Sequence, residues 1–145
     1  MQMPLLLLLP LALGFAPAPV FRERPNDPEA ILHRLQGGWR GVSYSQGGQK
    51  QLVGTPFRVH LDKDHWRFFT GSPSVESNLY TITLDTKSNP MRIDWRNGKT
   101  HLVGLFQLTN HRLRYSFRYA GNGYPQSLAE PAPEDYVIEV EREKR

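Results

Sequence analysis

Apolar and polar residues alternate along most of the chain after position 39, as they do in strands with one buried face. Met91, Ile93 and Trp95, for example, alternate with three charged residues. Because successive side chains of a strand point to opposite faces, one face of this segment is apolar and the other polar. Together with a strand starting at Trp39, about eight segments are predicted as strands, the others being 57–61, 66–68, 80–84, 102–108, 113–119 and 136–140.

The turns between these segments are short and use residues such as those of Gly47-Gly48 and Asn97-Gly98. Sequential hairpins of this kind predict an antiparallel sheet, and closure of such a sheet removes its exposed edges. We therefore predict an all-β fold, an antiparallel up-and-down β-barrel of about eight strands. Segment 102–108 is apolar on both faces and is expected to be the best-covered strand. The long connection 120–134, with several Gly and Pro residues, is expected to be a flap or an irregular crossing.

A short helix is predicted immediately before the barrel. Asp27-Pro28-Glu29 combines an N-cap residue, a first-turn proline and an early acidic residue. Ile31, Leu32 and Leu35 supply an apolar stripe, and Gly37-Gly38 ends the helix within about two turns.

The first residues have the pattern of an export signal. Residues 1–15 carry no charge, and the apolar run from Leu5 to Phe15, interrupted by Pro10, is too short to span a bilayer comfortably. We predict a signal peptide at 1–18 with an open cleavage point, a linker at 19–27 and the barrel domain at 28–145. Export to the periplasm, the cell envelope or the medium is therefore expected, and the alternative is a buried N-terminal helix.

Composition and charge narrow the possible functions. Cysteine is absent, which excludes disulfides, thiolate metal sites and a cysteine nucleophile. The net charge is +4, and Arg112, Arg114 and Arg118 share the outward face of one predicted strand. Glu139 and Glu141 on the next strand are expected to neutralise them in part. A solvated surface is the first interpretation, contact with an anionic envelope polymer or lipid headgroups is the alternative, and nucleic acid is not expected for an exported chain.

Catalytic and metal-binding motifs give little support for an enzyme. Gly-x-Ser-x-Gly and phosphate-binding glycine loops are absent from the sequence. His60 and His65 flank one turn but are too few for a metal site, and Asp62 and Asp64 are typical turn residues. We therefore predict no catalytic residue, no metal and no cofactor.

Several motifs resemble a known family. Leu35-Gln36-Gly37-Gly38-Trp39 resembles the Gly-x-Trp signature of lipocalin-like barrels. Together with Gly104–Leu108, Arg112–Tyr115 and Val137–Arg142, it is similar to a family of exported planctomycete domains over residues 31–142. The family has no assigned activity, so the resemblance implies a lipocalin-like fold and leaves the function open.

The resemblance also implies a clamp at the floor of the barrel, in which an arginine of the final strand packs across the Gly-x-Trp ring. Gly37, Trp39 and Arg142 are the matching residues. Arg142 shares the parity of Ile138 and Val140, so it is expected to point inward. The alternative is an arginine that lies in solvent at a frayed chain end.

Six aromatic residues on the inner faces are candidate ligand contacts, with ordinary core packing as the alternative. They are Trp66, Phe68, Tyr80, Trp95, Tyr115 and Phe117. The favoured function is non-enzymatic binding of a small apolar or amphipathic ligand, or an interaction module in the cell envelope. The alternative is an enzyme of unknown class at the barrel mouth that uses His60, His65 or the long connection. The interior decides between these hypotheses, because a filled barrel favours the interaction module and an open apolar one favours the binder.

Overall fold

The computed structural model describes residues 26–51, 54–71 and 75–144, and it contains one α-helix, nine strands and a short 3-10 turn. These elements are α1 (Pro28–Leu35), β1 (Gly37–Gln46), β2 (Gln49–Gln51), β3 (Phe57–Asp62), β4 (His65–Thr70), β5 (Val75–Asp85), β6 (Met91–Asn97), β7 (Thr100–Leu108), β8 (Arg112–Tyr119), η1 (Ala120–Asn122) and β9 (Tyr136–Arg142). The expected signal peptide at 1–18 and most of the linker at 19–27 lie outside the described residues.

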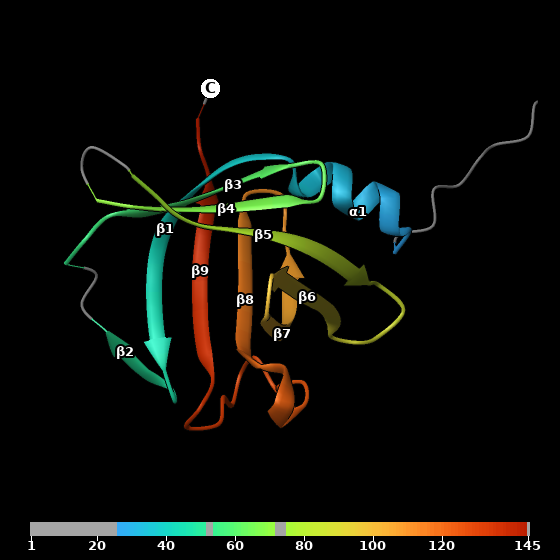
Figure 1. The fold of residues 1–145 in the computed structure, drawn as a ribbon, viewed down its shortest axis with the longest axis vertical. Helices are drawn as coiled ribbons and strands as arrows, with labels where there is room; N and C mark the ends of the chain where they lie inside the picture. The colour runs from blue at the N-terminus through green and yellow to red at the C-terminus, as the bar shows by residue number, and fades with distance from the viewer. Residues whose placement is uncertain (1–25, 52–53, 72–74, 145) are drawn as a thin grey trace, which may run out of the picture.

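The strands form one antiparallel sheet in the order β2-β1-β3-β4-β5-β6-β7-β8-β9. An additional antiparallel pairing of β1 with β9 closes the sheet on itself, as Figure 1 shows for these two neighbouring strands. The predicted up-and-down barrel of eight strands is therefore confirmed. The sequence pattern did not predict β2, a three-residue strand that is fully exposed and pairs only with the end of β1.

A bulge in β1 sets which of its side chains face the interior. The register between β1 and β9 shifts between Gly41 and Ser43, so Val42 is an extra residue and lies 37% exposed. Because one residue is inserted, Trp39 and Tyr44 both point inward although they are five positions apart.

Helix α1 begins and ends as the sequence predicts. The Asp27 carboxylate accepts a hydrogen bond of 3.1 Å from the amide of Ala30, and Pro28 occupies the first turn. Ile31 and Leu35 are buried in the same core as the strands. The helix lies toward the end of the barrel from which β9 leaves, opposite the β1–β2 hairpin (Figure 1). No helix in the described part of the chain is long and apolar enough to cross a bilayer.

Arg142 lies against Trp39 at the helix end of the barrel. Its guanidinium carbon is 4.2 Å from the centroid of the Trp39 ring. The same guanidinium donates to the carbonyl of Gln36 at 2.9 Å and to that of Arg34, while the indole N–H of Trp39 donates to Leu35 at 2.8 Å. Three carbonyls at the C-terminus of α1 are thus satisfied, and a cation sits where the helix dipole favours one.

We expect Arg142→Ala to lower the free energy of unfolding by about 2–3 kcal/mol, because both the cation–π contact and the charge-assisted hydrogen bonds are lost. Arg142→Lys should recover only part of this, since an ammonium cannot stack and bond both carbonyls together. Urea unfolding followed by tryptophan fluorescence measures both. Equal stability of the Ala and Lys variants would contradict the role of the planar group.

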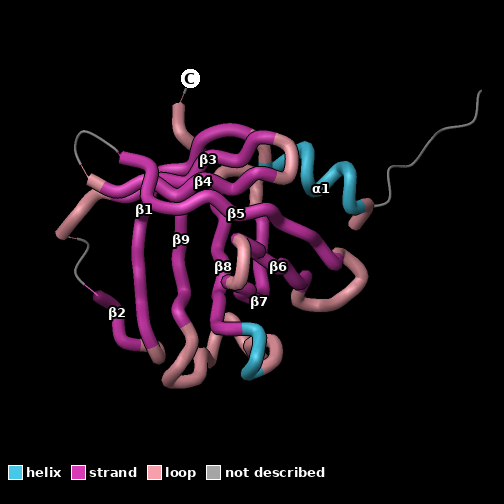
Figure 2. Tube along the Cα trace, in the orientation of Figure 1, coloured by secondary structure: helices cyan, strands magenta, loops and turns pink. Residues whose placement is uncertain are grey.

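The connection from β8 to β9 covers the outer face of β7, β8 and β9. The outward side chains of Val103, Leu105, Ser116 and Val137 are all at most 5% exposed, and Leu128 of the connection is buried with them. Figure 2 shows this segment as loop apart from the single turn η1. The outward apolar residues Val103 and Leu105 of segment 102–108, which the sequence predicts to be the best-covered strand, are therefore buried under this connection, and the predicted flap or crossing is an irregular cover.

A hydrogen bond of Tyr124 attaches the β8–β9 connection to β6. The hydroxyl of Tyr124 donates to the carboxylate of Asp94, whose other oxygen lies 2.9 Å from Nε2 of His101. The Arg92 guanidinium lies 4.6 Å from the centroid of the Tyr124 ring. Burial and the hydrogen bond to Asp94 raise the pKa of Tyr124 to about 12, so its hydroxyl stays a donor at neutral pH.

Candidate functional site

The barrel interior is filled at one end and hollow at the other. Toward α1 the core is closed by fully buried side chains such as Leu35, Trp39, Leu61 and Leu113. In the other half lies a cavity of about 790 Å³, a size that suits a small organic ligand. Half of the described lining residues are aromatic, and the described lining residues are Tyr44, Gly54, Thr55, Phe57, Trp66, Phe68, Thr70, Asn78, Tyr80, Trp95, Thr100, Leu102, Tyr115, Phe117, Arg118, Tyr119, Asn122, Glu134, Tyr136 and Ile138.

Three rings form the base of the cavity. Trp66, Trp95 and Tyr115 are each at most 4% exposed. The Trp66 ring stands nearly perpendicular to the other two, with centroid distances of 5.6 Å to Trp95 and 5.1 Å to Tyr115. These edge-to-face contacts fix the rings in place, so the base of the cavity is rigid.

Two groups of parallel rings form the walls. On β8, β9 and β1, Phe117 stacks with Tyr136 at 5.1 Å, and Tyr136 stacks with Tyr44 at 5.9 Å. On β3 and β4, Phe57 stacks with Phe68 at 5.8 Å. A Cβ on Gly41 would lie 2.5 Å from the Phe57 ring, so glycine at that position lets the ring pack against β1.

All six residues that the sequence singled out as ligand contacts line this one cavity. Their role toward a ligand stays a prediction. Five further lining residues of the walls were not predicted as ligand contacts, although inward parity was visible for most of them. They are Tyr44, Phe57, Leu102, Tyr136 and Ile138.

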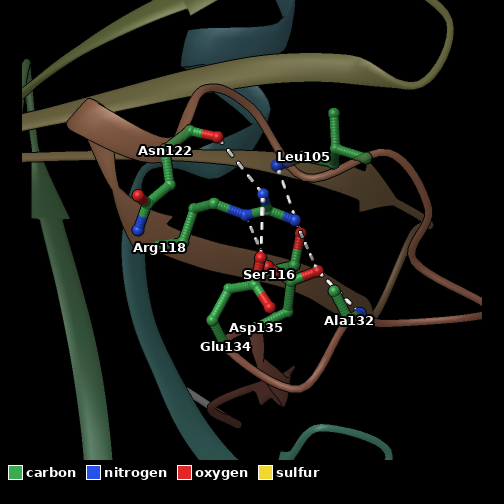
Figure 3. Close-up of polar contacts among 7 residues, drawn as sticks. All are labelled: Leu105, Ser116, Arg118, Asn122, Ala132, Glu134 and Asp135. Carbon is green, nitrogen blue, oxygen red and sulfur yellow. Dashed lines mark hydrogen bonds and ion pairs between the residues drawn. The ribbon is translucent and has the colours of Figure 1, made fainter.

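Arg118, which lines the cavity, forms a buried ion pair with Asp135, and Figure 3 shows the contacts of this pair. Nε of Arg118 lies 2.6 Å from Oδ1 of Asp135, and Nη2 lies 3.0 Å from Oδ2. Nη1 contacts the Glu134 carboxylate at 3.4 Å. Asp135 is 1% exposed, and its Oδ2 also accepts from the amide of Ala132 at 2.9 Å. The hydrogen bond to Asp135 raises the pKa of Arg118 above its ordinary value, so the guanidinium stays charged.

The prediction that Arg112, Arg114 and Arg118 form a solvated surface is wrong for Arg118. It is only 9% exposed, because the β8–β9 connection folds over it. Arg114 donates to the carbonyl of Leu128 in the same connection at 3.1 Å. Only Arg112 behaves as the strand pattern predicts, with Nη1 at 2.6 Å from the Glu139 carboxylate. The strand pattern could not foresee a cover formed by residues outside the strands.

Several polar groups of the cavity have no partner in the described part of the protein. The hydroxyls of Tyr44, Tyr80, Tyr115 and Tyr136 make no hydrogen bond there, and neither do the indole N–H groups of Trp66 and Trp95. Burial raises the pKa of Tyr115, Tyr80 and Tyr44 above the ordinary value, with smaller contributions from neighbouring tyrosines for the last two. These phenols therefore remain neutral hydrogen-bond donors at the pH of ordinary solutions.

The residues of the alternative enzyme hypothesis lie elsewhere. His60 and His65 lie on β3 and β4 next to the turn at the closed end, so their expected place at the barrel mouth is wrong. Nδ1 of His65 lies 2.9 Å from the carboxylate of Asp64, and neither histidine lines the cavity. The long connection does contribute Asn122 and Glu134 to the rim. Over residues 26–51, 54–71 and 75–144, no cluster of three or more His, Asp or Glu side chains is placed to hold a metal ion.

Fold and cavity together define a small antiparallel β-barrel with a hollow, aromatic interior at one end. Comparison of the chain with protein-family models, curated proteins and solved structures finds no match. The resemblance to exported planctomycete domains therefore stays a prediction, and the function is argued from the geometry of the cavity.

Proposed function

We propose that this chain is a non-enzymatic binding protein, exported to the cell envelope or the medium, that holds a small apolar or amphipathic ligand inside its barrel. The cavity of about 790 Å³ is the observation that carries the proposal. A barrel that served only as an interaction module could be filled by its own side chains, as the half next to α1 is.

The distribution of polarity in the cavity supports an amphipathic occupant. Its base consists of the buried rings of Trp66, Trp95 and Tyr115, whereas Asn122 and Glu134 lie exposed at the rim. A ligand with an apolar body and a polar end would place the body against the rings and the end in water, which removes apolar surface from solvent.

Binding of the uncharged fluorescent probe N-phenyl-1-naphthylamine tests the proposal. We expect saturable binding to the wild-type protein with one site per chain. Leu102→Trp, which places a larger side chain into the cavity wall, should weaken binding at least about tenfold, because it removes volume that the probe needs.

Thr83→Trp is the matched control, because Thr83 lies exposed on β5 and does not line the cavity. This variant should bind the probe as the wild type does. Two results would overturn the proposed function. One is the absence of saturable binding of this probe and of a neutral aliphatic competitor, 1-dodecanol, and the other is an equal loss in both tryptophan variants.

A further inference from the structure

We propose that the preferred ligand is an uncharged aromatic molecule with a hydrogen-bond acceptor, such as an aromatic ketone, whose acceptor oxygen bonds the hydroxyls of Tyr80 and Tyr115. This inference rests on the proposed function and specifies the chemical class of the ligand. Three properties of the cavity carry it, namely its rings, its unpartnered donors and its lack of unpaired charge.

The rings favour an aromatic occupant over an aliphatic one. The rings of the walls pair in stacked geometry, as in Phe117 with Tyr136 at an interplanar angle of 13°, and the rings of the base pair edge-to-face, as in Trp66 with Tyr115 at 84°. A planar ligand between these walls can add contacts of both kinds, which stabilise ring pairs beyond the burial of their area. An alkyl chain of equal area gains only the burial.

The unpartnered polar groups favour a ligand that brings an acceptor. The indole N–H groups of Trp66 and Trp95 are donors only, and the phenol hydroxyls of Tyr80 and Tyr115 donate readily. None of these groups has a hydrogen-bond partner among the described residues. A donor that loses water without gaining an acceptor is unfavourable, so a pure hydrocarbon would bind less well than a ketone of the same shape.

Tyr80 and Tyr115 are placed to act on one ligand. Tyr80 is the cross-strand partner of Trp66 in the pairing of β4 with β5. The ring of Tyr115 lies 5.1 Å from that of Trp66 across the base of the cavity. Both hydroxyls thus belong to residues that neighbour the same indole and line the same cavity.

The charges in the cavity disfavour an ionic ligand. Among the described lining residues only Arg118 and Glu134 are charged, and they contact each other at 3.4 Å. Arg118 is also bound by Asp135 on its other nitrogens. An ion at the base of the cavity would lose its hydration without meeting an unpaired opposite charge, and such a transfer is strongly unfavourable.

Equilibrium dialysis with a matched set of probes tests the inference. The set consists of 2-acetonaphthone, its hydrocarbon analogue 2-ethylnaphthalene, the anion 2-naphthoate, the cation 2-naphthylmethylammonium and the aliphatic 1-dodecanol. We expect the ketone to bind about fivefold more tightly than the hydrocarbon, and at least about tenfold more tightly than either ion.

The double variant Tyr80→Phe/Tyr115→Phe removes both hydroxyls and keeps both rings, so it should fold and should lose the preference for ketone over hydrocarbon. Tyr124→Phe is the matched control, because Tyr124 does not line the cavity and its hydroxyl is bound to Asp94, so this variant should leave the ratio unchanged. Far-UV circular dichroism and tryptophan fluorescence check that each variant is folded.

The outcomes separate this inference from the proposed function. Tightest binding by 1-dodecanol would overturn the aromatic character of the proposed ligand, and tightest binding by either ion would overturn its lack of charge; both results would leave the proposed function standing. A ratio of ketone to hydrocarbon that survives in the folded double variant would overturn the assignment to Tyr80 and Tyr115. Failure of all five probes to bind, together with failure of N-phenyl-1-naphthylamine, would overturn both proposals.

Discussion

Asp135→Ala is expected to lower the free energy of unfolding by about 3–5 kcal/mol, because it leaves the Arg118 guanidinium buried without its partner. The Arg118 side chain is only 10% exposed, and two of its nitrogens lie within 3.0 Å of the Asp135 carboxylate. The variant also removes the acceptor of the Ala132 amide. Urea unfolding monitored by circular dichroism measures the loss.

Glu134→Ala is the matched control, since Glu134 contacts the same guanidinium with a side chain that is 48% exposed. An exposed partner contributes little, so this variant should lose less than about 1 kcal/mol. A double variant, Arg118→Met with Asp135→Leu, should be more stable than Asp135→Ala, because no charge is left unpaired. Equal losses for Glu134→Ala and Asp135→Ala would contradict the role assigned to burial.

Gly104→Ala is expected to destabilise the barrel by about 3 kcal/mol or more, because the site has no room for a methyl group. A Cβ on Gly104 would overlap the carbonyl oxygen of Ser116 on the neighbouring strand and would lie 2.9 Å from Cζ3 of Trp95. The first contact involves backbone, which cannot rotate away. The second would displace a ring of the cavity base, so ligand binding should weaken as well.

Gly121→Ala is the control for this substitution, since nothing lies within 4 Å of a Cβ at that position. It should change the free energy of unfolding by less than about 0.5 kcal/mol. Thermal unfolding of both variants under the same conditions tests the comparison. Similar midpoints for Gly104→Ala and Gly121→Ala would show that β7 and β8 can move apart at low cost.

The strands were predictable because their signal is local. In β6, Ile93 and Trp95 are buried and the charged neighbours face outward, as the period of two requires. The helix start was equally visible, since Asp27 and Pro28 act within one turn. Such features depend only on residues that are close in sequence, which a single sequence displays directly.

The cavity and its rim were only partly predictable. Parity shows that Trp66 and Tyr115 point inward, but it does not show how much of the interior their rings leave empty. The pair of Arg118 with Asp135 joins residues 17 positions apart across a loop without a periodic pattern. The sequence contains only an indirect sign of the loop that buries this pair. Val103 and Leu105 are apolar on the outward face of β7, so another segment must cover them.

The closure of β1 onto β9 has a consequence for biosynthesis. The hydrogen bond from Arg142 to Gln36 spans 106 positions, and the whole β1–β9 ladder joins the two ends of the domain. Contacts of such long range form late, because the intervening chain must lose its conformational freedom first. Until β9 has paired, β1 keeps one bare hydrogen-bonding edge, with which another polypeptide can pair. The chain before closure, rather than the finished barrel, is therefore the species most exposed to such pairing.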